Sequence, residues 1–278
     1  MKKILVPVDF SDHSAYAMEV AAAFAKANDA EIILLHMLGL SPSLLNKDES
    51  QEVAEAVFFM KLAEKRFKEF EARKFLEGLH VTELVFNYKD FKEINNLAQE
   101  HGADLIVMGS HGSSGLSEIF VGSNTEKVVR SSEIPVCVVK HQLSDFKIDR
   151  VVFACDFKTD NIMAYRRAMR FFQTIGADVD LVYVNLPGDR FRSTTHINKM
   201  ANEFLDIADF EAPLTADEIV YLSGYTVEQA IFDYADYIAA DALAIPTHGR
   251  KGLAHFFNGS IGEDLANHSK LPVITFKI

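Results

Sequence analysis

The chain has 278 residues, of which 49% are hydrophobic and 24% charged, so it has the composition of a folded globular protein with room for two domains. That composition excludes intrinsic disorder and fibrous structure, and no stretch approaches the roughly 18 consecutive apolar residues of a membrane span. A formal net charge of −12, without a long run of Lys or Arg, argues against nucleic acid and membrane surfaces as partners.

The first half of the chain alternates between strand-like and helix-like segments. Short apolar runs rich in β-branched residues predict strands at 4–8, 31–37, 82–86, 105–108 and 136–139. Helices are predicted between them: an Ala-rich one that ends near Asn28, an amphipathic one over 51–79, one over 91–101 and a short one from about Asn124. Ser11 and Asp12 offer N-cap chemistry for the first helix. Apolar strands joined by helices are typical of a parallel sheet that is covered on both faces.

The second half of the chain repeats the first. KILVPVDF from Lys3 matches RVVFACDF from Arg150, and the second strand recurs at the same offset of 147 residues. Further along, HGSSGL from His111 matches HGRKGL from His248 at an offset of 137 residues. The second copy has therefore lost ten residues after its second strand.

This repeat predicts two α/β domains of one design, residues 1–143 and 148–278, joined by a short linker. The N-terminal residues resemble a strand rather than a signal peptide, so we expect a cytoplasmic protein. The two cysteines, Cys137 and Cys155, are too few for a disulfide framework and match no zinc or redox motif. Both are predicted to be buried thiols.

A glycine-rich loop follows the fourth strand of the first half. Ligands of open parallel sheets bind outside the carboxyl ends of the strands, where the strand order reverses, and there Asp9 should lie beside Gly109. The loop has further glycines at Gly112 and Gly115, and the last helix begins directly after Gly122. Such glycines let the backbone approach a ligand, and the start of a helix presents unpaired amide groups. A phosphate group would fit there.

The same residues also allow a purely structural interpretation. Ser123 with Glu126, and Ser260 with Glu263, have the spacing of a capping box, and the glycines can serve only as turn residues. The loop is neither a Walker A motif nor the Rossmann fingerprint, and the chain has no nucleophile elbow. Enzymes that depend on those motifs are therefore not predicted.

The spacing Gly-x2-Gly-x9-Gly-Ser from Gly109, together with VPVDFS at the end of the first strand, resembles the ATP-binding branch of the universal stress protein (UspA-like) family. The resemblance covers nearly the whole chain as a tandem of two such domains. It implies doubly wound five-stranded parallel-sheet domains of the adenine nucleotide alpha hydrolase-like, Rossmann-like type, packed as a pseudo-dimer through their last strands. The implied ligand is ATP, or ADP or AMP, with Mg²⁺.

The resemblance also implies a set of binding residues in the first domain. Asp9 would accept hydrogen bonds from adenosine, Met108 and Gly109 would line the ribose and phosphate, and the start of the last helix would hold the phosphates. The whole set is Pro7, Val8, Asp9, Met37, Met108, Gly109, His111, Gly112, Gly122, Ser123, Asn124 and Thr125. No catalytic residue and no protein metal site is predicted.

The second copy departs from this pattern. Pro246 replaces Gly109, which removes an amide donor, although the later Gly259-Ser260 pair is retained. Arg250 and Lys251 add positive charge that would favour an anion. We favour a structural pseudodomain that does not bind nucleotide.

Three functions are compatible with these features. The first is a stress-response regulator or sensor in which ATP occupancy shifts conformation or the choice of an unknown protein partner. The second is a slow ATPase or an adenylyl-transferring enzyme, which ranks lower because the first loop contains no general base or catalytic lysine. The third is a scaffold that binds a protein through residues 39–80 without nucleotide. Further homodimerisation of the tandem chain stays open.

Overall fold

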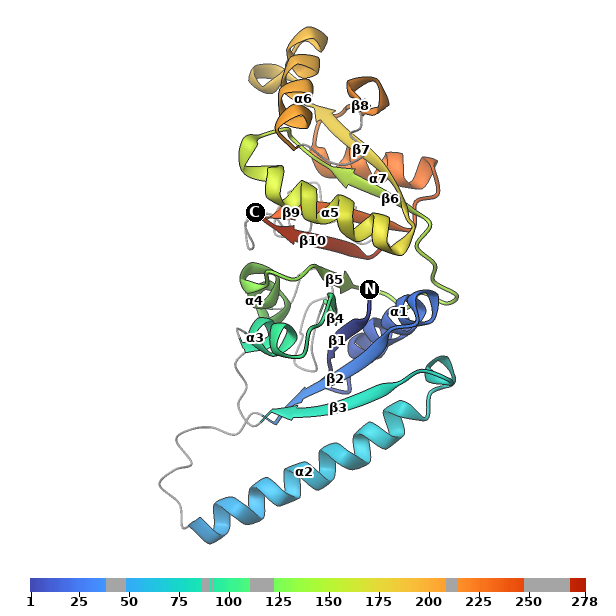
Figure 1. Ribbon diagram of the computed structural model, residues 1–278, viewed down its shortest axis with the longest axis vertical. Helices are drawn as coiled ribbons and strands as arrows, with labels where there is room; N and C mark the ends of the chain where they lie inside the picture. Colours follow the sequence, from blue (N-terminus) through green and yellow to red (C-terminus); the bar gives the residue numbers. More distant parts are fainter. Residues whose placement is uncertain (39–48, 87–90, 92, 111–122, 209–214, 248–270) are drawn as a thin grey trace.

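The computed structural model describes the whole chain except residues 39–48, 87–90, 92, 111–122, 209–214 and 248–270 (Figure 1). The strands of the first half are β1 (Lys3–Pro7), β2 (Glu31–Met37), β3 (Val81–Phe86), β4 (Leu105–Gly109) and β5 (Val136–Val139). Those of the second half are β6 (Arg150–Ala154), β7 (Asp178–Asn185), β8 (Val220–Ser223), β9 (Ala242–Thr247) and β10 (Val273–Lys277).

Helices alternate with these strands in both halves. The first half has α1 (Asp12–Asn28), α2 (Glu49–Glu71), α3 (Glu93–Glu100) and α4 (Ser123–Ser131), and the second has α5 (Ile162–Ile175), α6 (Thr194–Ala208) and α7 (Val227–Tyr237). The predicted helix over 51–79 ends earlier, at Glu71, and a short 3₁₀ turn at Lys74–Leu76 follows it. The turn places Leu76 in the core, which a continuing helix would not do. Among the described helices, none is long and apolar enough to cross a membrane.

The strands form a ten-stranded sheet in the order β3-β2-β1-β4-β5-β10-β9-β6-β7-β8. Within each half every described strand pair is parallel, as the alternation of strands and helices predicted. The halves join through their last strands, because β5 pairs with β10 in antiparallel register with Cys137 opposite Ile274. The expected fold class is confirmed: two doubly wound domains meet as a pseudo-dimer.

Helices cover both faces of the sheet. One core layer contains residues of α1, α2, α5 and α6, and the other contains residues of α3, α4 and α7. Successive strand residues enter opposite layers, so Ile4 and Val6 pack with α1 whereas Leu5 packs on the other face. Both cysteines are buried, as predicted, and burial raises the pKa of each thiol to about 12.

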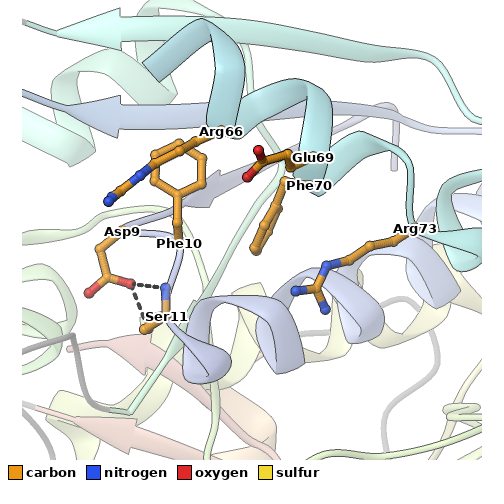
Figure 2. Close-up of a pocket in the computed structure, with 7 residues that line it drawn as sticks. All are labelled: Asp9, Phe10, Ser11, Arg66, Glu69, Phe70 and Arg73. Atoms are coloured by element: carbon orange, nitrogen blue, oxygen red, sulfur yellow. Dashed lines mark hydrogen bonds between the residues drawn. The ribbon is translucent and has the colours of Figure 1, made fainter. Parts of the chain in front are cut away.

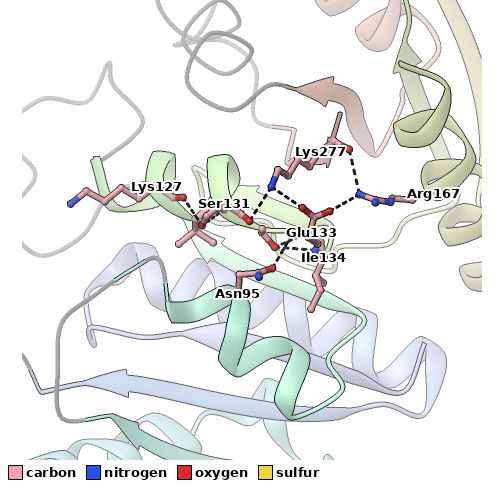
Figure 3. Close-up of polar contacts among 9 residues, drawn as sticks. Asn95, Lys127, Ser131, Glu133, Ile134, Arg167 and Lys277 are labelled. Carbon is pink, nitrogen blue, oxygen red and sulfur yellow. Dashed lines mark hydrogen bonds and ion pairs between the residues drawn. The ribbon is translucent and has the colours of Figure 1, made fainter. Parts of the chain in front are cut away.

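An ion-pair cluster connects the two halves beside the antiparallel strands (Figure 3). Glu133, which precedes β5, accepts hydrogen bonds from Lys277 Nζ at 2.7 Å and from Arg167 Nη1 at 3.1 Å. Lys277 also donates to the Ser131 carbonyl at the end of α4, at 3.4 Å. The hydrogen bond from Lys277 is the largest cause that holds the pKa of Glu133 below its ordinary value. The second half thus contacts the last residue of α4.

Candidate functional site

Strands β1 and β4 are neighbours in the sheet, as the sequence predicted. The two strands pair in parallel, with Ile4 opposite Leu105 and Leu5 opposite Ile106. The helix after β1 covers one face of the sheet and the helix after β4 covers the other, so this is the point at which the strand order reverses. Ligands of doubly wound sheets bind at such a point.

Asp9 follows β1 and is fixed by the first turn of α1. Its Oδ1 atom accepts hydrogen bonds from the Ser11 amide at 3.1 Å and from the Ser11 hydroxyl at 2.6 Å. Ser11 is the N-cap of α1, because its Oγ atom accepts from the Ser14 amide at 3.3 Å. The half-buried carboxylate therefore lies at the positive end of a 17-residue helix dipole.

Phe10, between Asp9 and Ser11, has a left-handed backbone with φ of 64°. That conformation is costly for a bulky side chain, and aromatic packing offsets the cost. The Phe10 ring lies 4.6 Å from the His36 ring and 5.3 Å from the Phe67 ring, measured between centroids. The second half repeats the turn, since Phe157 has φ of 56° and stacks on Tyr183. The sequence analysis did not single out this aromatic residue, although the repeated Asp-Phe pair is its signal.

Gly109 is required for packing, without any unusual backbone angle. A Cβ atom added there would lie 2.7 Å from the carbonyl oxygen of His13, in the first turn of α1. The absent side chain lets the start of α1 lie against the end of β4, close to Asp9. From sequence, Gly109 was expected to allow the approach of a ligand or to form a turn. The structure adds a packing reason, which is contact with His13.

Thr125 connects α4 to the end of β4. Its side chain is buried, and its hydroxyl donates a hydrogen bond to the Gly109 carbonyl at 2.7 Å. The hydroxyl proton is therefore engaged within the protein, and the first backbone amides of α4 have no partner within the helix itself. Ser123 begins this helix and Asn124 is half-buried in its first turn.

The remaining predicted residues lie at neighbouring strand ends or outside the described residues. Pro7 ends β1 and pairs with Leu35 of β2, and the buried Val8 donates its amide to the Leu35 carbonyl at 2.8 Å. Met37 ends β2 and is half-buried, whereas Met108 is buried in β4. Three predicted residues lie outside the described residues: His111, Gly112 and Gly122.

In the second half, Asp156, the equivalent of Asp9, accepts hydrogen bonds from neighbouring side chains. Asp156 accepts hydrogen bonds from Lys158 Nζ and from Asn161 Nδ2, each at 2.5 Å. Lys158 stands where the first half has Ser11, and its bond to Asp156 raises the pKa of the ammonium. Pro246 lies in β9 opposite Phe276, and Arg250, Lys251, Gly259 and Ser260 fall outside the described residues.

A groove opens on the other side of Asp9, between the turn at residues 9–11 and α2 (Figure 2). Its volume is about 430 Å³, and Arg66, Phe70 and Arg73 line it from α2 and the residues just after that helix. The sequence analysis did not predict these arginines as site residues. The sequence signal for Arg66 is its place one residue before the buried Phe67 of the predicted amphipathic helix, whereas Arg73 follows the end of α2 and has no such signal.

Comparison with known proteins gives consistent matches to both halves. Residues 1–140 and 147–277 each match the model of the universal stress protein family. A universal stress protein of Methanocaldococcus jannaschii is 35% identical over 157 residues, which cover 51% of this chain and 97% of that protein. The Bacillus subtilis universal stress protein YxiE is 34% identical over 147 residues, which cover 50% of this chain and 98% of that protein. A solved universal stress protein from Archaeoglobus fulgidus DSM 4304 aligns with 99% of this chain and 96% of its own, at 26% identity and a TM-score of 0.66.

Proposed function

The chain belongs to the universal stress protein family as a tandem of two domains, and we propose that its first domain binds an adenine nucleotide, with ATP as the first candidate. Occupancy of that site would regulate a stress response by shifting conformation or the choice of a protein partner. The proposed domain bounds are 1–143 and 148–278, and the proposed location is the cytoplasm.

The position of Asp9 is the observation that carries this proposal. The carboxylate is held by Ser11 at the point where the strand order reverses, next to Gly109. A carboxylate only accepts hydrogen bonds, so it suits a ligand that offers hydroxyl donors, such as a ribose. The amides at the start of α4 suit a phosphate, and Thr125 holds that helix start against β4. The hydroxyl groups of one nucleotide would thus meet the Asp9 carboxylate, and its phosphates would meet the amides at the start of α4.

Different observations bear on the adenine base and on the Mg²⁺ ion of the proposed ligand. Met37, half-buried at the end of β2, offers apolar surface for an adenine ring, whereas the Val8 side chain is buried in the core after β1. The described residues contain no cluster of three His, Cys, Asp or Glu side chains that would hold a metal ion. We therefore expect Mg²⁺, where present, to be held mainly by the nucleotide phosphates rather than by a protein site.

We propose that the second domain is structural. Asp156 already accepts hydrogen bonds from Lys158 and Asn161, so a ribose would have to displace a salt-bridged lysine. Such displacement removes a charge-assisted hydrogen bond, which is among the stronger polar contacts in proteins. The two aspartates, equivalent by sequence, should therefore differ in function.

The test uses this pair of aspartates as a matched control. Calorimetric titration of the full chain with Mg-ATP is compared among the unaltered protein, Asp9→Asn and Asp156→Asn. We expect Asp9→Asn to weaken binding at least about tenfold through loss of the charged acceptor, and Asp156→Asn to leave it unchanged. Mass spectrometry of small molecules released on denaturation should detect adenine nucleotide. The proposal is wrong if the unaltered protein neither carries nor binds adenine nucleotide, or if both variants lose binding equally.

A further inference from the structure

The groove beside α2 presents two guanidinium groups that are fixed in orientation. The Arg66 guanidinium lies over the Phe10 ring, 5.6 Å from its centroid, and the Arg73 guanidinium lies over the Phe70 ring at 4.7 Å. A guanidinium stacked by its face on an aromatic ring keeps its N–H donors at the edge, available to another partner. Figure 2 shows Arg66 over Phe10 at the Asp9 end and Arg73 at the other end, with Phe70 between them.

Neither arginine has an acidic partner in the part of the chain that the structure describes, although the protein has a net charge of −12. Glu69, which also lines the groove, forms its ion pair with Lys65 at 3.9 Å, and that lysine does not line the groove. In so acidic a protein, two stacked arginines without an acidic partner among the described residues form a local site for a negative charge.

The other groups at the groove set the kind of anion. Ser11 places the positive end of the α1 dipole at one wall, which adds to the attraction. Asp9 and Glu69 are carboxylates, so a weakly charged anion would gain little from the groove as a whole. The two guanidiniums lie over different rings, Phe10 and Phe70, whose centroids are 5.7 Å apart, so a ligand that contacts both arginines needs charge along its length. An oligophosphate group has that property.

We propose that Arg66 and Arg73 form an anion site for an oligophosphate group of two or three phosphoryl units, either free or as the tail of a nucleotide. Each guanidinium donates charge-assisted hydrogen bonds to phosphoryl oxygens at one end of the groove. The site is separate from the amides at the start of α4, because it lies on the side of Asp9 that faces α2. Asp9 lines both this groove and the proposed nucleotide site, so the nucleotide-tail form of the proposal rests on the proposed function, whereas binding of a free oligophosphate does not.

The experiment titrates the full chain with inorganic tripolyphosphate and, separately, with ATP. The test variant is Arg66→Gln with Arg73→Gln, which removes both charges and leaves a shorter polar side chain at each exposed position. The matched control is Lys61→Ala with Lys68→Ala, which removes the same charge from exposed positions of α2 outside the groove. A third variant, Gly122→Arg, fills the predicted phosphate space of the glycine loop.

We expect tripolyphosphate binding to weaken at least tenfold in the arginine variant and to change less than twofold in the lysine control and in Gly122→Arg. Binding should also weaken as salt rises, since exposed charges are screened. If ATP binding is lost only in Gly122→Arg, the ligand of the groove is a free oligophosphate. If ATP binding is lost only in the arginine variant, the ligand of the groove is the phosphate tail of a nucleotide. The proposal is overturned if tripolyphosphate does not bind, or if the lysine control weakens it as much as the arginine variant. Circular dichroism of each variant checks that the fold is retained. If the double glutamine variant does not fold, Arg66→Lys with Arg73→Lys takes its place, because lysine keeps the charge but loses the planar donor fork of arginine, and weaker tripolyphosphate binding is again expected.

Discussion

Replacing Gly109 with alanine tests whether this glycine exists for packing. The new Cβ atom would lie 2.7 Å from the His13 carbonyl oxygen and 3.0 Å from the His13 Cβ atom. Both are parts of a helix turn that cannot rotate away, so either β4 or the start of α1 must shift. Overpacking of this kind costs about 1–3 kcal/mol, whereas the lower entropy of the unfolded chain with alanine returns about 0.4–1 kcal/mol. We therefore expect the free energy of unfolding to fall by about 1–2 kcal/mol.

Differential scanning calorimetry and urea unfolding measure this change. For a chain of this size the melting temperature should fall by roughly 2–8 °C. A double-mutant cycle with His13→Ala isolates the cause, because alanine keeps the carbonyl and the Cβ atom that meet the new side chain. The coupling energy should stay below about 0.5 kcal/mol. Restored stability in the double variant would show that the imidazole is the obstacle, and an unchanged stability of Gly109→Ala would refute the packing argument itself.

The remaining predictions concern the join between the halves and the thiols. Glu133→Gln should lower stability at neutral pH by about 0.5–1 kcal/mol, since its pairs with Arg167 and Lys277 are partly exposed, and urea unfolding in high salt should reduce that difference. Because the folded pKa of Glu133 is lower than its ordinary 4.5, its contribution is present above that value and is lost as the pH falls through the folded pKa. The gap between the unaltered protein and Glu133→Gln should therefore close at acid pH, and a gap that widens there would contradict the assignment. Cys137 and Cys155 should not react with a thiol reagent at pH 8 until the chain unfolds, because both are buried with a pKa of about 12, and rapid reaction of the native protein would show that the halves open.

Part of the candidate site could be predicted because it depends on neighbours in the chain. The apolar runs, the N-cap at Ser11 and the repeated Asp-Phe pair are local patterns, and the fold that they indicated is the fold observed. The difference between Asp9 and Asp156 also has a local cause, since the partner of each lies two residues further on. The replacement of Gly109 by Pro246 in the second half was predicted to matter, whereas the replacement of Ser11 by Lys158 was not recognised from sequence.

The sequence by itself determined the two-domain repeat, the alternation of strands and helices, and the place where the strand order reverses. Only the tertiary structure determined three contacts: the close approach of Gly109 to His13, the ring that lies under Arg66, and the ion pairs by which Glu133 joins the halves. Those contacts connect atoms from segments far apart in the chain. Periodicity fixes which face of an element is buried, but the distance between two elements depends on how all their side chains pack together.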